Sequence, residues 1–180
     1  MNNSLFCSHH IFKLTNFLVS TIYSWKLKTT PLVGNIAVSY LGAISFFAAG
    51  LISISFSQTL GHPVFILAVI GFFGTLSREI LKDIRDVKGD RAIGAKTLPI
   101  IASEKIARIF ANASLAVGIV LLFTPYIFGM FRLVYLASLT PAVAVCLYTF
   151  LKPPEKAEKL VKIAIFLVFL AFIVGSLVGF

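Results

Sequence analysis

Acidic side chains are absent from the first 78 residues of this 180-residue sequence, and only seven occur in the whole chain. Charged residues of both signs make up 13% of the chain, whereas soluble domains carry about 25%. An ordinary soluble domain is excluded, because long stretches of this chain present no charge to water. The composition is that of an integral membrane protein.

Cysteine is also scarce. The two that occur, Cys7 and Cys146, lie far apart in the chain, which excludes a disulfide framework and a thiolate metal site. Residues 1–16 lack the basic start and small-residue cleavage site of a secretory signal. The net charge of +9 is spread over loops between apolar runs, without the interleaved aromatic residues of a nucleic-acid surface. We therefore expect no nucleic-acid partner.

Long uncharged runs dominate what is present. About 20 helical residues match the hydrocarbon thickness of a bilayer, and five runs approach or exceed that length: residues 34–56, 63–81, 109–130, 133–151 and 163–180. Each is free of charge except at the end of the second, which includes Arg78 and Glu79. A weaker sixth run, residues 11–25, is short and carries Lys13 and Asn16. We expect an all-α, polytopic transmembrane helical bundle of about six spans in the lipid bilayer, forming one domain over residues 1–180.

The loops between these runs alternate in charge. Lys26 and Lys28 follow the first run, and the segments 82–105 and 152–162 are strongly basic, while the turns between them hold at most one arginine. The positive-inside rule places the basic loops in the cytoplasm. Residues 78–96 carry ten charged side chains, and inserting them would cost on the order of 30 kcal/mol, so this segment lies at the cytoplasmic edge of the membrane.

Four of the seven acids stand in that segment, at spacings of four, three and four residues: Glu79, Asp83, Asp86 and Asp90. Helical geometry places them on one face, where their mutual repulsion favours a bridging divalent cation. Mg²⁺ takes one or two carboxylates, water and phosphate oxygens, and Asp86 and Asp90 are one turn apart. A solvated helix end with surface ion pairs produces the same alternation of acids and bases, so spacing alone leaves both interpretations open.

Two smaller features concern helix ends and packing. Gly89 and Gly94 predict a transition from helix to loop within or just after the acidic cluster. His62, beside Pro63, is expected to cap the start of a span. Gly175 and Gly179 form a G-x-x-x-G pattern that allows close helix packing, although chance is an equal explanation.

The segment 78–99 resembles the second aspartate-rich motif of the UbiA superfamily of intramembrane prenyltransferases, in particular its archaeal lipid branch. In that motif an acid precedes D-x-x-x-D and then a G-x-K-[ST] turn, positions held here by Glu79, Asp86, Asp90, Gly94, Lys96 and Thr97. Residues 23–28, Tyr-Ser-Trp-Lys-Leu-Lys, followed by Gly34-Asn35, are similar to the family segment Y-S-x-x-L-K … G-N.

The resemblance implies a reaction in which Mg²⁺ binds a prenyl diphosphate, the diphosphate leaves, and the allylic cation passes to an acceptor. It implies that Asp86 and Asp90 are the catalytic metal ligands, supported by Asp83 and Glu79. The implied diphosphate- or phosphate-binding residues are Lys26, Lys28, Lys96, Arg78, Asn35 and Tyr23. Metal ions and basic side chains suit the charge that gathers on a leaving diphosphate, and an apolar bundle shields the cation from water.

The family pattern includes nine spans and a further motif, N-x-x-x-D-x-x-x-D, after the second span, whereas no acid precedes Glu79 here. The chain corresponds to the C-terminal two-thirds of the family, truncated at its N-terminal side. We expect transfer of a geranylgeranyl group to a glycerol-phosphate-type lipid acceptor at the cytoplasmic face of the cell membrane. Alternatives are an aromatic acceptor, an inactive fragment, or a part that needs a complementing N-terminal subunit. Cation transport is disfavoured, because the acids lie at a membrane edge and none at the midplane.

Overall fold

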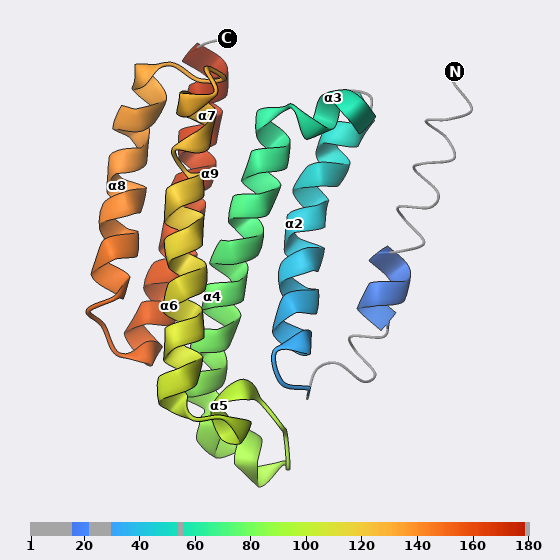
Figure 1. Ribbon diagram of the computed structural model, residues 1–180, viewed down its shortest axis with the longest axis vertical. Helices are drawn as coiled ribbons and strands as arrows, with labels where there is room; N and C mark the ends of the chain where they lie inside the picture. Colours follow the sequence, from blue (N-terminus) through green and yellow to red (C-terminus); the bar gives the residue numbers. More distant parts are fainter. Residues whose placement is uncertain (1–15, 22–29, 54–55, 179–180) are drawn as a thin grey trace.

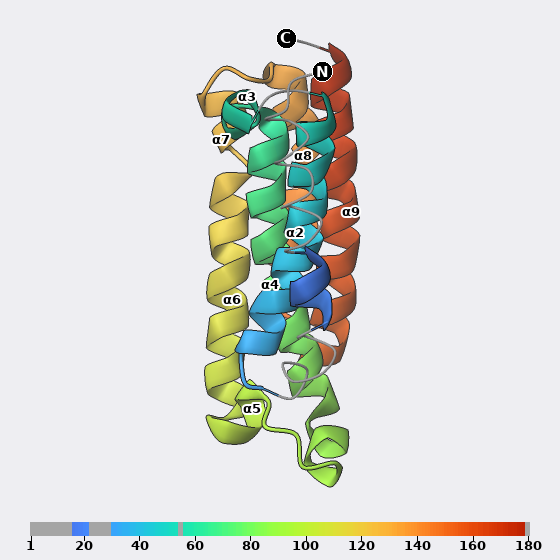
Figure 2. The same ribbon diagram turned by 90° about the vertical axis from the view of Figure 1, so that its right-hand side faces the viewer.

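The structure is a computed structural model that describes residues 16–21, 30–53 and 56–178. These residues form helices and turns without a strand, and Figures 1 and 2 show most of the long helices running along the long axis of the bundle. Residues 16–21 are a short helical segment. The other helices are α2 (Val33–Ser53), α3 (Phe56–Leu60), α4 (Pro63–Ala92), α5 (Leu98–Ile101), α6 (Glu104–Leu121), α7 (Thr124–Ile127), α8 (Leu133–Thr149) and α9 (Pro154–Val178).

Four helical stretches in the described part of the chain are long and apolar enough to cross a membrane: Val33–Leu51, Pro63–Ala92, Glu104–Ile127 and Pro154–Val178. The predicted span 133–151 corresponds to α8, a shorter apolar helix of 17 residues. The predicted all-α membrane bundle is thus confirmed, with four helices of spanning length and the shorter α8 among the described residues. Only 16–21 of the weaker run 11–25 lie inside the description, so the sixth span stays a prediction.

Helix α4 is the centre of the bundle. It packs against α2 on one side and against α6 and α9 on the other, and α8 packs on α9. In Figure 1 α2 and α8 therefore stand on opposite sides of α4. Because α4 touches three helices, residues on its different faces can take part in separate sites.

The start of α4 follows local capping chemistry. His62 has extended backbone angles and its Nδ1 accepts from the Val64 amide at 3.3 Å, while Pro63 occupies the first helical position. Proline suits that position because its missing N–H would have had no partner in the helix. The predicted cap at His62 is confirmed.

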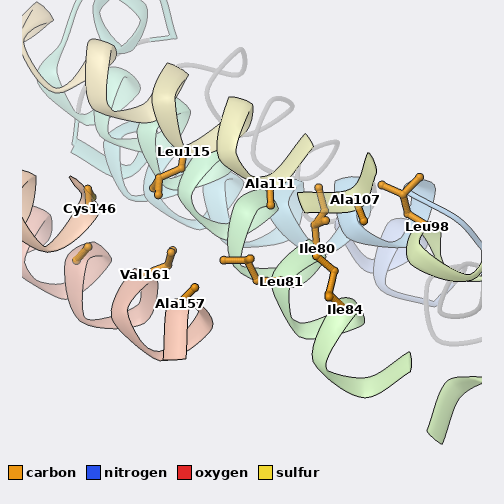
Figure 3. Close-up of a cluster of buried hydrophobic side chains, with 11 residues drawn as sticks. Ile80, Leu81, Ile84, Leu98, Ala107, Ala111, Leu115, Cys146, Ala157 and Val161 are labelled. Atoms are coloured by element: carbon orange, nitrogen blue, oxygen red, sulfur yellow. The ribbon is translucent and has the colours of Figure 1, made fainter. Parts of the chain in front are cut away.

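The core nearest the acidic end is built from alanine and branched aliphatic residues. Figure 3 shows Ile80, Leu81 and Ile84 of α4 between small side chains of α6 and α9, among them Ala107 and Ala157. Both alanines are 0% exposed. Small residues let helix backbones approach closely, which is the main source of packing energy between membrane helices. This packing fixes the rotation of α4, and with it the direction of its acidic face.

At the other end the core is aromatic. Phe131, Tyr135 and Phe172 form a cluster with ring centroids 4.8–5.5 Å apart, and the Tyr135 hydroxyl donates to the Leu122 carbonyl at 2.9 Å. Phe131 also covers Gly175, where an added Cβ would lie 2.9 Å from the ring. Close packing therefore occurs at Gly175, while Gly179 lies outside the described residues.

Candidate functional site

The four clustered acids lie on one helix and line one cavity. Helix α4 does not end at residue 81, where the apolar run stops, but continues to Ala92 and carries Glu79, Asp83, Asp86 and Asp90 along its last four turns. All four line a cavity of about 250 Å³, which we call the acidic cavity. The end of α4 that carries these acids lies at the lower end of the bundle in Figure 1, where α4 extends toward α5.

The first turns of α2 form the opposite wall. Gly34, Asn35 and Val38 line the cavity, and Asn35 Nδ2 donates to Asp83 Oδ2 at 2.8 Å. Asn35 is buried, and a hydrogen bond to a charged acceptor is stronger than one between neutral groups. This contact fixes the start of α2 against the acidic face of α4.

The third wall is the turn that follows α4. Gly94 has a φ of +69°, which glycine adopts without the cost of a Cβ, and the Ala95 amide donates to the Asp90 carbonyl at 2.9 Å. This is the hydrogen-bond pattern that ends many helices at a glycine. The turn brings Ala95 and Thr97 back to the cavity, where the buried Thr97 hydroxyl has no hydrogen-bond partner among the described residues.

Basic side chains neutralise two of the four acids. Glu79 accepts from Arg78 Nη1 at 2.9 Å and from Lys82 Nζ at 3.5 Å. Asp86 accepts from both Nε and Nη2 of Arg85, at 2.8 and 2.9 Å. No hydrogen bond or ion pair between described residues reaches the Asp90 carboxylate, so this side chain is available to a ligand.

Both arginines are tied to a third helix. Glu158 of α9 is buried and accepts from Arg78 Nε at Oε1 and from Arg85 Nη1 at Oε2, each at 3.1 Å. One buried carboxylate thus holds the two cations that contact Glu79 and Asp86. Sequence reasoning missed Glu158: it stands with Glu155 among lysines before an apolar run, and nothing in its spacing connects it with α4.

The donor set of the acidic cavity fits Mg²⁺ shared with a phosphate. All of its acidic donors are oxygens, the ligands that Mg²⁺ prefers. Within the described ranges no three His, Cys, Asp or Glu side chains converge closely enough to hold a metal ion by themselves. Because Mg²⁺ commonly takes one or two carboxylates and completes its shell with water and substrate phosphates, a pair such as Asp86 and Asp90 suits such an ion.

Only some of the predicted phosphate-binding residues lie at the acidic cavity. Asn35 lines the cavity, whereas Arg78 and Lys96 do not. Arg78 faces Glu158 on α9, and Lys96 is exposed in the turn after α4. Tyr23, Lys26 and Lys28 lie outside the described residues. Lys82 was not among the predicted phosphate-binding residues, yet it lines the cavity; its position three residues after Glu79 was the available signal.

An aromatic groove is formed by other residues of the same two helices. It has a volume of about 340 Å³ and is lined by Tyr40, Ala43, Ile44 and Phe47 of α2 and by Phe65, Ala68, Val69 and Phe72 of α4. Phe65 and Phe72 stand 14 and 7 residues before Glu79, and residues seven apart lie near one face of a helix. One face of α4 is therefore apolar in its first half and acidic in its second.

Fold and cavity together define a polytopic helical membrane protein with an acidic cavity at one end of its bundle. The profile of the UbiA prenyltransferase family matches residues 11–176. The chain belongs to the UbiA prenyltransferase family, as the motif at 78–99 predicted.

Similar proteins carry one common name. The digeranylgeranylglyceryl phosphate synthase of Methanopyrus kandleri is 37% identical over 171 residues, which cover 90% of this chain and 60% of that protein. The protein of the same name from Methanobrevibacter smithii is 34% identical over 167 residues, which cover 88% of this chain and 58% of the relative. A solved structure of digeranylgeranylglyceryl phosphate synthase superposes with a TM-score of 0.83 at 28% identity, covering 93% of this chain and 61% of that one. The chain thus spans about 60% of the length of these relatives.

Proposed function

We propose that this chain carries the diphosphate site and the prenyl groove of a Mg²⁺-dependent membrane prenyltransferase, which transfers a geranylgeranyl group to a glycerol-phosphate-type lipid at the cytoplasmic face. One observation supports this most directly: the acidic cavity and the aromatic groove follow each other along α2 and α4. A prenyl diphosphate has the same division, a polyanionic head on a long apolar chain. The names of the relatives agree with this substrate class.

Asp86 and Asp90 hold the metal in this proposal, and Glu79 and Asp83 support them. When bound, Mg²⁺ supplies positive charge to the diphosphate oxygens as the carbon–oxygen bond breaks. Lys82, which lines the cavity, donates to the same leaving group from the chain itself. The Thr97 hydroxyl, buried and without a partner, contributes a further donor at the wall of the cavity. Lys96, Lys26 and Lys28 remain proposed clamps for diphosphate or acceptor phosphate.

The groove holds the isoprenoid chain and excludes water from the allylic cation. Its lining is almost wholly apolar, with aromatic rings from Tyr40, Phe47, Phe65 and Phe72. Such rings attract a cation through their faces. The chain's own contribution is thus to orient the diphosphate at one end and to protect the reacting carbon at the other.

Binding and turnover are measured separately, because the chain spans only part of its relatives' length. The purified chain in detergent is titrated with radiolabelled geranylgeranyl diphosphate with Mg²⁺ or with EDTA, and then supplied with a glycerol-phosphate lipid acceptor. Asp86→Ala combined with Asp90→Ala is expected to weaken Mg²⁺-dependent binding about 100-fold. The matched control, Glu104→Ala with Glu155→Ala, removes the same charge from exposed positions and is expected to leave binding unchanged.

The two readouts separate the parts of the proposal. Binding that persists in EDTA, or that survives loss of both aspartates, overturns the metal site. Binding that requires Mg²⁺ and both aspartates, without product from any acceptor, supports the diphosphate site and overturns transfer by this chain alone. In that case addition of a complementing N-terminal subunit is expected to restore turnover.

A further inference from the structure

A second polar cavity lies on another side of α4. It has a volume of about 440 Å³ and is formed by Ile84 of α4, Glu104, Lys105 and Arg108 of α6, and the segment 150–154 that joins α8 to α9. It shares no residue with the acidic cavity. We call it the basic cavity, because three of its four charged side chains are cations.

Arg108 of α6 binds the end of α8 in the wall of the basic cavity, and one of its guanidinium nitrogens has no hydrogen-bond partner among the described residues. Its Nη2 donates to the carbonyls of Thr149 and Lys152 at 3.1 and 2.9 Å, which caps the end of α8. Its Nη1 is buried and has no acceptor among the described residues. A buried N–H without an acceptor is unfavourable, so this nitrogen indicates an acceptor supplied from outside the chain.

Two lysines add charge without being neutralised. None of the ion pairs within the described part of the chain involves Lys105, Arg108 or Lys152. Lys152 Nζ lies 4.1 Å from the centroid of the Tyr148 ring, a contact that leaves its hydrogen-bond capacity for an anion. Glu104 is the one opposing acid in the lining, so the cavity carries a net positive charge of two.

The position of the basic cavity in the bundle indicates which kind of anion it binds. It lies where α6 and α9 begin and α8 ends, at the same end of the bundle as α5 (Figure 1). Leu151 in its wall is 79% exposed. Ile101, three residues before Glu104, is 55% exposed. Exposed aliphatic side chains beside lysines at the end of membrane spans are typical of the boundary between hydrocarbon and headgroups. The anion most abundant at that depth is a lipid phosphate.

We propose that the basic cavity binds the phosphate group of an anionic phospholipid. Arg108 Nη1 donates to a phosphate oxygen, and the Lys105 and Lys152 ammonium groups contact the remaining oxygens. The lipid chains leave toward Leu151. This site is separate from the acidic cavity and does not depend on prenyl transfer.

The test leaves Arg108 in place, because its Nη2 caps α8 and its loss would weaken the fold. The full chain in detergent is titrated with dioleoylphosphatidylglycerol, dioleoylphosphatidylcholine or inorganic phosphate, and bound lipid is counted by native mass spectrometry. Lys105→Gln with Lys152→Gln is expected to weaken binding of phosphatidylglycerol about tenfold. Lys159→Gln with Lys162→Gln removes the same charge from exposed positions of α9 outside the cavity and is expected to change it little.

Each outcome of this titration either supports or overturns the proposed lipid site. Preference for phosphatidylglycerol that is lost only in the Lys105 and Lys152 variant supports the site. Equal weakening in both variants indicates general attraction to an anionic surface and overturns it, as does unchanged binding in the cavity variant. Inorganic phosphate that displaces phosphatidylglycerol at equal concentration overturns the assignment to a lipid and identifies a free phosphate site.

Discussion

Arg85 of α4 and Glu158 of α9, 73 residues apart in sequence, are joined by a hydrogen bond of 3.1 Å from Nη1 to Oε2. The same guanidinium binds Asp86 through its other two nitrogens. Glu158 therefore sets the position of Arg85, and Arg85 sets the orientation of a carboxylate in the acidic cavity. The Glu158 side chain thus connects the core of the bundle with the acidic cavity.

Replacing Glu158 by Gln is expected to destabilise the chain by about 2 kcal/mol, because two arginines lose their shared carboxylate. The arginine side chains are 28% and 32% exposed, which keeps the loss below that of a fully buried pair. The measurement is the thermal midpoint in detergent, with Glu155→Gln on the exposed side of α9 as control. A structural role alone predicts no other effect.

A positioning role predicts a second effect of Glu158→Gln. The Mg²⁺ concentration that gives half-maximal binding of prenyl diphosphate is expected to change at a temperature where the variant is fully folded. In the proposed metal site Asp86 would have to exchange Arg85 for the metal, and the position of Arg85 would control that exchange. An unchanged Mg²⁺ dependence would leave Glu158 as a structural residue only.

Asn35 is expected to be sensitive to a change of charge. Asn35→Ala removes the donor to Asp83 and costs about 1–3 kcal/mol, the range for a hydrogen bond to a charged group. Asn35→Asp places a second carboxylate within hydrogen-bond distance of Asp83 and is expected to cost more than Ala. Thermal midpoints of the two variants test the order, and an Asp variant as stable as the original chain would contradict the contact.

Two glycines of long helices are expected to respond in opposite ways to alanine. Gly175→Ala places a Cβ 2.9 Å from the Phe131 ring and is expected to destabilise the chain by about 1–3 kcal/mol through overpacking. An added Cβ at Gly89 of α4 meets nothing within 4 Å, so Gly89→Ala is expected to stabilise it by about 0.5–1 kcal/mol. Thermal midpoints of both variants, measured side by side, check the packing of α9.

The proposed prenyl groove predicts a change in chain-length preference. Val69→Phe fills the groove, and displacing two buried CH₂ groups of the isoprenoid costs about 1.6 kcal/mol, or about tenfold in affinity. The dissociation constant of geranylgeranyl diphosphate is expected to rise by at least that factor, while that of the shorter geranyl diphosphate changes little. Val117→Phe, on an exposed position of α6, is the matched control. Equal effects on both diphosphates would place the tail elsewhere.

Removing the Tyr135 hydroxyl tests the aromatic end of the bundle. Tyr135→Phe leaves the buried Leu122 carbonyl without the 2.9 Å hydrogen bond and keeps the ring contacts. The expected loss of stability is about 1 kcal/mol, with binding of prenyl diphosphate unchanged because the acidic cavity lies at the other end. A loss of Mg²⁺-dependent binding in this variant would show that the two ends are coupled.

The acidic face of α4 could be predicted from the sequence because all its members belong to one helix. Positions 79, 83, 86 and 90 share a face wherever the helix goes, since their relation depends only on 3.6 residues per turn. The apolar runs could be predicted for the same reason, because each consists of contiguous residues. Four of the five clear runs correspond to helices long enough to span a membrane. The family followed from the motif at 78–99, since its residues are contiguous.

Relations between helices were decided by the tertiary structure. The resemblance grouped Asn35 with the acids, but nothing in the sequence connected Glu158 with them. Only the fold shows that Asn35 binds Asp83 across 48 residues and that Glu158 binds Arg78 across 80. Arg78, expected at the diphosphate, faces α9. The physical reason is that the rotation of each helix is set by its packing against its neighbours, here by the small alanines that α6 and α9 present to α4. Periodicity determines which residues share a face, and only packing decides what that face meets.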